Sequence, residues 1–146
     1  MAEPLKYSKI LVPTDGSKGA VYAGRHAVYL AKGLGAEVLV LNVIDSDLAF
    51  HSGLHYADEV AELEAYGAKA TASIKTLCDE AGVRAREIIA RGSPANTILA
   101  VAGDERVDCI VIGTVGMSAV ERALLGSVSS KVSHHATCPV LLVRAP

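Results

Sequence analysis

The sequence predicts an open, doubly wound α/β fold of the Rossmann-like type, with helices on both faces of a five-stranded parallel sheet of order 3-2-1-4-5. Three observations lead to this prediction. Short apolar runs alternate along the chain with longer stretches of helical periodicity, in the order βαβαβαβαβ. The connections are long enough for right-handed crossovers between parallel strands. Ala, Val, Leu and Ile must build the core, because the chain has no Trp and one Phe.

The first part of the chain gives two strands and a helix. Lys9–Pro13 is a short apolar run that ends at a proline, so it is predicted as the first strand. Ser17–Leu34 carries Ala and Leu at spacings of three and four residues, which is one face of a helix, and Gly33 and Gly35 are expected to end that helix. Glu37–Ile44 is continuously apolar, which indicates a strand covered on both faces.

The middle of the chain repeats this alternation after a loop. Asp45–Tyr56 mixes polar and apolar residues without a period, so we interpret it as a loop. Ala57–Ala81 is rich in Ala and Glu and precedes a glycine, which predicts the second helix. Arg84–Ala90 is predicted as the third strand. Ser93 has the residue type of an N-cap and Pro94 that of a first helical position, so the third helix should run from there to about residue 103.

The last part of the chain completes the sheet. Asp108–Gly113 is predicted as the fourth strand, and glycines punctuate the segment that follows it. Ser127–Ala136 carries apolar residues at intervals of four, which predicts a helix with one buried stripe. Pro139–Arg144 is predicted as the fifth strand.

Composition restricts the class of protein. The 146 residues fit one domain, residues 1–146. The net charge is −2, and the basic residues are not interleaved with aromatics, so we expect neither nucleic-acid nor membrane binding. The sequence contains no apolar run of transmembrane length and no signal-like segment in residues 1–9. Cys78, Cys109 and Cys138 form no CxxC pair, so disulfides and zinc are not expected, and we expect a cytoplasmic protein.

Two segments should meet at the carboxyl edge of the sheet, where strand order reverses and ligands bind in such folds. The segment Pro13–Ser17 follows the first strand. Gly113 and Gly116 follow the fourth strand and allow close approach of the backbone to a ligand. Gly126 and Ser127 then begin a helix, whose amides and dipole favour an anion. Each piece alone is an ordinary turn or cap, but their joint placement predicts a polyphosphate cradle, although the Walker A and GxGxxG patterns are absent.

At these residues the sequence resembles the universal stress protein family, on its ATP-binding branch. The most specific part is the spacing Gly113-x2-Gly116-x9-Gly126-Ser127, which matches the ATP-binding signature of that branch. The resemblance extends over nearly the whole chain and includes Ile10–Ser17, Leu41–Asp45, Arg91–Pro94 and Cys138–Arg144. Val115 is a departure, because many binders have His at this position, and a polar neighbour of the phosphates is therefore missing.

The resemblance implies that ATP is the ligand and assigns residues to its parts. The adenosine would be lined by Pro13, Thr14, Asp15, Val43 and Ile112, with Asp15 near the adenine or ribose and Val43 packed on the adenine. The ribose and phosphates would be held by Gly113, Gly116, Gly126, Ser127 and Val128. Any Mg²⁺ or Mn²⁺ would be carried on the phosphates rather than in a protein cage.

Several functions are compatible with such a site. The first is a regulatory, stress-response module whose nucleotide state changes a surface seen by a partner or a second subunit. The alternative is an ATPase or phosphotransferase. Its turnover would be slow, because the phosphate loop has no Lys and the only nearby bases are Asp15 and Glu121. A phospho-receiver is disfavoured, because one Asp rather than a cluster of acids follows the first strand. The third strand also ends at Ala90-Arg91 rather than at an Asp. A flavin-binding module is a further option, which the colour of the purified protein would reveal.

Two further features concern assembly and metal binding. Val140–Val143 is an apolar strand at the predicted edge of the sheet, and such an edge needs to be paired or covered. We therefore expect a homodimer through antiparallel pairing of this strand, as the resemblance also implies. His51 and His55 lie four residues apart near several acids and could be metal ligands. Their segment has no helical period, so we interpret it as a loop and assign no metal site and no catalytic residue.

Overall fold

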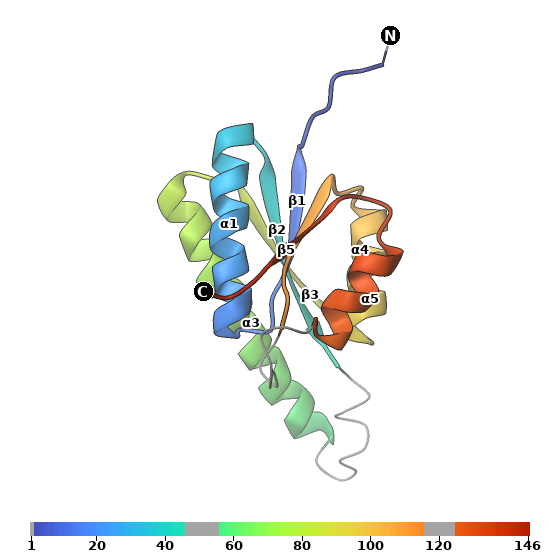
Figure 1. The fold of residues 1–146 in the computed structure, drawn as a ribbon. Helices are drawn as coiled ribbons and strands as arrows, with labels where there is room; N and C mark the ends of the chain where they lie inside the picture. The colour runs from blue at the N-terminus through green and yellow to red at the C-terminus, as the bar shows by residue number, and fades with distance from the viewer. Residues whose placement is uncertain (1, 46–55, 116–124) are drawn as a thin grey trace.

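The computed structural model describes residues 2–45, 56–115 and 125–146 (Figure 1). Along the chain the elements are β1 (Lys9–Pro13), α1 (Lys18–Leu34), β2 (Glu37–Ile44), α3 (Tyr56–Ala81), β3 (Ala85–Arg91), α4 (Pro94–Asp104), β4 (Cys109–Gly113), α5 (Ser127–His135) and β5 (Val140–Val143). The strands form one five-stranded sheet of order β3-β2-β1-β4-β5, and all paired strands are parallel. The predicted fold class and strand order are confirmed.

The register of the sheet places two loop segments at the same edge. β1 is central, with Lys9 opposite Glu37 and Pro13 opposite Leu41 in β2, and with Ile10 opposite Cys109 in β4. β1 and β4 are neighbours in space although two other strands separate them in sequence. Strand order reverses between them, so the segments that leave their carboxyl ends flank the position where this fold class binds ligands.

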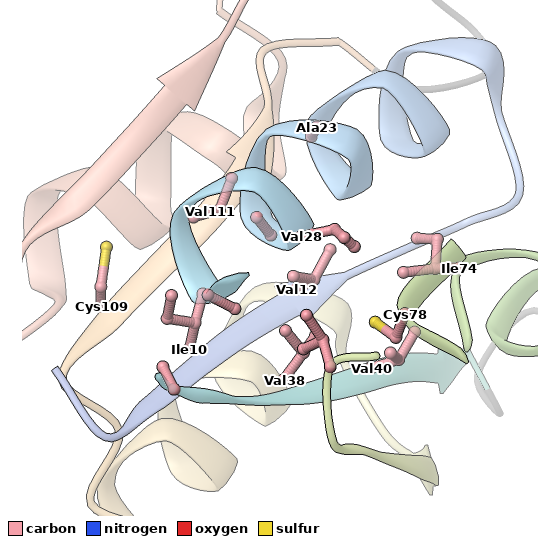
Figure 2. Packing of buried hydrophobic residues seen from close by; sticks show 14 of the residues in the cluster. Ile10, Val12, Ala23, Val28, Val38, Val40, Ile74, Cys78, Cys109 and Val111 are labelled. Atoms are coloured by element: carbon pink, nitrogen blue, oxygen red, sulfur yellow. The ribbon is translucent and has the colours of Figure 1, made fainter. Parts of the chain in front are cut away.

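Helices cover both faces of the sheet, with α1 and α3 on one face and α4 and α5 on the other (Figure 1). Under α1 and α3 lies one core cluster, which includes Val12, Val40, Ile74 and Cys78 (Figure 2). The second cluster, under α4 and α5, includes Ile98. β2 contributes to both clusters and is buried along almost its whole length, as its apolar run predicted. No helix in the described ranges is both long and apolar enough to cross a membrane.

The helix ends agree with the sequence prediction in part. Ser17 caps α1, because its Oγ accepts the Ala20 amide at 3.1 Å. Gly35 ends α1 in the left-handed conformation, with φ of +70°, whereas Gly33 lies inside the last turn and does not end the helix. Ser93 occupies the N-cap of α4, but its hydroxyl makes no capping hydrogen bond. Pro94 stands at the first turn and has no backbone N–H, so this end needs fewer capping acceptors.

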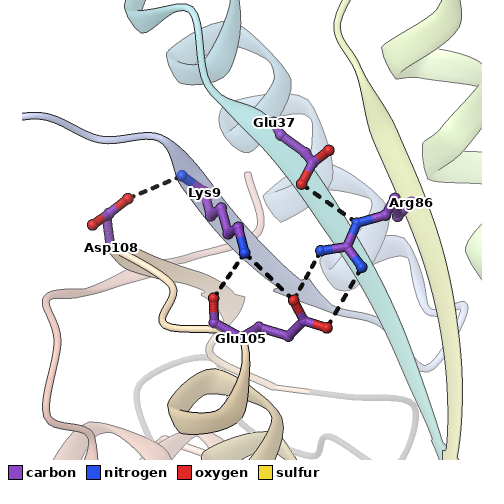
Figure 3. Close-up of polar contacts among 5 residues, drawn as sticks. All are labelled: Lys9, Glu37, Arg86, Glu105 and Asp108. Carbon is purple, nitrogen blue, oxygen red and sulfur yellow. Dashed lines mark hydrogen bonds and ion pairs between the residues drawn. The ribbon is translucent and has the colours of Figure 1, made fainter.

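A cluster of charged side chains lies at the amino ends of the strands, opposite the carboxyl ends (Figure 3). The Arg86 guanidinium contacts a Glu105 carboxylate oxygen at 2.8 Å and Glu37 at 3.4 Å. Lys9 Nζ donates to the Glu105 carbonyl oxygen at 3.0 Å, and Asp108 Oδ2 accepts the Lys9 amide at 3.0 Å. The hydrogen bond from Arg86 holds the pKa of the Glu105 carboxyl below its ordinary value. These contacts fix the amino ends of the strands relative to α4.

The three cysteine thiols are free. Cys78 and Cys109 are buried in the core under α1 and α3, where each packs as a small side chain. Burial raises the pKa of the Cys78 thiol to about 11. Such thiols stay protonated at neutral pH and pack as small apolar side chains.

Candidate functional site

A pocket of about 340 Å³ lies at the carboxyl ends of β1, β2 and β4 and is also lined by the N-terminal parts of α4 and α5. It contains all but one of the site residues that the sequence analysis named. Those that line it are Pro13, Thr14, Asp15, Val43, Ile112, Gly113, Gly126, Ser127 and Val128. Gly116 lies outside the described residues, as do Glu121, His51 and His55. The structure thus brings together segments that are more than 100 residues apart.

Other lining residues were not named as site residues from the sequence. They are Ser17, Ala20, Leu41, Pro94, Ile98, Thr114, Val115 and Ser129. Pro94 and Ile98 had a usable signal, because residues four apart at the start of a helix share the face that meets the carboxyl edge of the sheet. Thr114 and Ser129 stand beside the glycine motif but carry none of its spacing, so local pattern gave no reason to single them out.

One wall of the pocket is apolar. Leu41 and Val43 of β2, Ile98 of α4 and Ile112 of β4 contribute aliphatic side chains to it. Leu41 is fully buried, and Ile112 and Ile98 are nearly so. These side chains, from the sheet and from α4, form an apolar slot that suits a flat, weakly polar ring system.

The segment Thr14–Ser17 is hereafter called the β1–α1 loop. Most of its backbone amides are hydrogen-bonded. The Thr14 amide donates to the Leu41 carbonyl oxygen at 2.8 Å. The Gly16 amide donates to Thr14 Oγ1 at 3.1 Å, and the Ser17 amide to Asp15 Oδ1 at 3.0 Å. Gly16 has φ of +80°, a conformation that glycine adopts without steric cost. This side of the pocket is therefore already shaped before any ligand arrives.

The opposite wall, at the N-terminus of α5, keeps open donors. An α-helix leaves its first amides without intrahelical partners, and no side-chain oxygen in the described chain caps α5. The Gly126 amide is an exception to the sequence expectation, because it donates to the Thr114 carbonyl oxygen at 2.7 Å and is not free. The amides of Ser127, Val128 and Ser129 follow it in the first turn, at the positive end of the helix dipole, and favour an anion.

The two described glycines of the motif, Gly113 and Gly126, are glycine for different structural reasons. A Cβ on Gly113 would lie 3.1 Å from the carbonyl oxygen of Gly19, so glycine allows α1 to approach β4 closely. A Cβ on Gly126 would lie 3.2 Å from the Thr114 carbonyl oxygen. Gly126 has φ of −65°, so its backbone conformation is open to other residues and only the close contact restricts it.

Charge in the pocket is sparse. Among the described lining residues, Asp15 is the one charged side chain. In the part of the chain that the structure describes, no group of three or more His, Cys, Asp or Glu residues could hold a metal ion. The described part of the site therefore offers shape, amide donors and one carboxylate to a ligand.

Comparison with known proteins places this chain in a family. The universal stress protein family model matches residues 6–144. The chain is 38% identical over 144 residues to universal stress protein MJ0531 of Methanocaldococcus jannaschii, covering 96% of this chain and 84% of that protein. It is 40% identical over 147 residues to universal stress protein YxiE of Bacillus subtilis, covering 94% and 99%. The solved structure of hypothetical protein MJ0577 matches with a TM-score of 0.87 and 31% identity, covering 97% of this chain and 99% of that one. By its sequence and its fold, the chain belongs to the universal stress protein family.

Proposed function

We propose that this protein binds an adenine nucleotide, ATP in the cell, in the pocket at the carboxyl edge of the sheet, and that it belongs to the ATP-binding branch of its family. The observation that carries the proposal is the pairing of two unlike walls in one cavity. The aliphatic slot accepts a base, and the uncapped N-terminus of α5 accepts phosphate. A volume of about 340 Å³ lies within the range of small-ligand pockets.

Each wall receives one part of the nucleotide in this proposal. Pro13, Thr14 and Asp15 border the adenosine, Val43 packs on the adenine, and Ile112 forms the base of the slot. The ribose and phosphates lie against Gly113, Gly116, Gly126, Ser127 and Val128. Mg²⁺ or Mn²⁺ enters on the phosphates, since Asp15 is the one carboxylate among the described lining residues.

Relatives support the choice of an adenine nucleotide. A universal stress protein that has been crystallised in complex with cAMP is 25% identical to this chain, with a TM-score of 0.70, and the match covers 96% of this chain and 98% of that one. A universal stress protein of Archaeoglobus fulgidus, solved in complex with dAMP, shares the fold with a TM-score of 0.68. An adenine ring with one phosphate is thus a ligand of other proteins built on this architecture.

A regulatory role in the stress response is the use of this binding that we propose, with the cytoplasm as its location. The protein acts as a homodimer in which two copies pair through β5. β5 is an edge strand of the sheet, and its Leu141 is 40% exposed. Pairing a second copy along this edge satisfies its open backbone groups and covers the leucine.

The test is direct identification of the ligand. The freshly purified protein is denatured, and any released small molecule is identified by mass spectrometry. The nucleotide-free protein is then titrated calorimetrically with ATP, AMP, adenosine and GTP. We expect ATP, ADP or AMP in the released fraction, and binding of the adenine ligands in preference to GTP. A nucleotide-free protein that binds none of the adenine ligands at millimolar concentration contradicts the proposal.

A further inference from the structure

We propose that Asn42 and Tyr66 are positioning residues for the nucleoside, which act from behind the wall of the pocket. Neither residue lines the pocket, and each donates a hydrogen bond to a backbone carbonyl of the β1–α1 loop. The inference rests on the proposed function, because it names the residues that hold the nucleoside wall in its binding shape.

Asn42 is a polar residue in an otherwise apolar strand. It is 5% exposed, and its Nδ2 donates to the Thr14 carbonyl oxygen at 2.9 Å. The backbone of α3 lies directly against this amide, because a Cβ built on Gly67 would be 2.3 Å from Asn42 Oδ1. Burial of an amide in a strand core costs free energy unless hydrogen bonds compensate it. The bond to the loop is thus the structural reason for a polar residue here.

Tyr66 contacts the next carbonyl of the same loop. Its hydroxyl donates to the Asp15 carbonyl oxygen at 2.8 Å across 51 positions of sequence. The hydroxyl also lies close to Gly16, where a Cβ would be 2.8 Å from it. Gly16 is therefore restricted both by its φ of +80° and by the tyrosine.

The two donors have a shared consequence for the wall. They hold the successive carbonyls of Thr14 and Asp15 toward β2 and α3, and the amides of Thr14, Gly16 and Ser17 are already bonded within the loop or to β2. Thr14 and Asp15 then line the pocket from a loop whose peptide planes are fixed. A ligand that binds a preformed wall loses less free energy to ordering than one that must organise it.

The first experiment removes one hydroxyl. Tyr66→Phe keeps the ring and deletes the donor to Asp15. Because Tyr66 supports the nucleoside wall, we expect adenosine, AMP and ATP to bind more weakly by the same factor, about two- to tenfold for one neutral hydrogen bond. Tyr29→Phe on α1 is the matched control, since Tyr29 is 81% exposed and absent from the pocket lining. The control should bind all three ligands like the parent.

The second experiment moves Asn42 without deleting it. Gly67→Ala places a methyl group against Asn42 Oδ1 and should weaken adenosine binding. In an Asn42→Ala background the nearest atom left to the same methyl group is the Cβ at position 42, 3.6 Å away, which is ordinary contact. Gly67→Ala should therefore cost adenosine affinity in the parent and add no further cost in Asn42→Ala, a non-additive cycle.

The outcomes separate this inference from the proposed function. If the parent binds no adenine ligand, the proposed function is wrong and the inference falls with it. If the parent binds adenosine, and both Tyr66→Phe and Asn42→Ala keep the dissociation constants of the parent for it, the inference is wrong and the proposed function stands. This holds even when their melting temperatures drop, because that result describes a purely structural role.

Discussion

Placing a negative charge at the first position of α5 should separate the phosphate from the nucleoside part of the binding energy. Ser127 is exposed at this position and lines the pocket. In Ser127→Glu the carboxylate faces the proposed phosphate site. The same charge lies at the positive end of the helix dipole, which stabilises a folded helix by about 0.3–1 kcal/mol. Binding and folding are therefore expected to change in opposite directions.

The expected loss of ATP binding free energy in Ser127→Glu depends on the solvent exposure of residue 127. Two unit charges about 4 Å apart interact by about 1 kcal/mol in water and about 4 kcal/mol near a protein surface. The exposure of Ser127 puts its carboxylate in the lower part of this range, at about 1–2 kcal/mol, or about 5- to 30-fold in Kd. The effect should shrink at high salt, because the Debye length falls to about 3 Å at 1 M.

The assay is calorimetric titration of Ser127→Glu against the neutral Ser127→Gln, which has a similar size. ATP binding should weaken by the stated factor, AMP binding by less, and adenosine binding should not change. The melting temperature of Ser127→Glu should equal or exceed that of Ser127→Gln. If ATP and adenosine weaken equally, or if Ser127→Glu binds ATP as tightly as Ser127→Gln, the phosphate does not lie at the N-terminus of α5.

Four further predictions address the fold, the assembly and the chemistry. Gly113→Ala should lower the free energy of unfolding by about 1–3 kcal/mol in urea titrations, because its Cβ meets the Gly19 carbonyl oxygen at 3.1 Å. Light scattering of the parent should give twice the 15.1 kDa of one chain, and Leu141→Lys should shift it toward one chain; a monomeric parent contradicts pairing through β5. The lowered pKa of Glu105 stabilises the fold above the unfolded pKa, and this stabilisation is lost as pH falls through the folded pKa, so the difference in melting temperature between parent and Glu105→Gln should vanish in acid and be present at pH 7. Steady-state phosphate release should stay well below about 10 s⁻¹, and fast metal-dependent release that Asp15→Ala abolishes would instead indicate an enzyme.

Local pattern predicted the fold and the two segments of the candidate site that follow β1 and β4, but not the contribution of α4. Hydrophobic period located the strands and helices, and the rule for parallel sheets placed the loops after β1 and β4 at one edge. The sequence pattern could not predict which hydrogen bonds individual backbone groups make. Gly126 stands at a helix N-terminus, where a free amide is the default, yet a contact with Thr114 occupies that amide. Such a contact depends on where α5 docks, which no residue spacing encodes.

The residues that support the β1–α1 loop could also not be recognised as such from the sequence. Asn42 carried a signal, since an amide in an apolar strand needs a partner, but the identity of that partner follows only from the fold. Tyr66 carried none, because its position on α3 looks like any polar helix surface and its acceptor lies 51 residues away. Motif and resemblance named several of the residues that line the candidate pocket, whereas the residues that support the β1–α1 loop became visible only in three dimensions.

The glycines at the two ends of the motif illustrate why a shared spacing need not have one cause. Gly113 is required by the approach of α1 to β4, so its replacement should act on the fold whether or not a nucleotide is present. Gly126 has an ordinary backbone conformation, and its Cβ would press on the Thr114 carbonyl that anchors the first turn of α5. Ser129 Oγ donates to that same carbonyl at 2.8 Å, so a displaced Thr114 loosens two contacts at the end that faces the proposed phosphate. Substitution at Gly126 therefore acts chiefly on the orientation of the helix amides, and ATP should lose more affinity than adenosine, whereas any loss of affinity in Gly113→Ala should scale with its loss of stability.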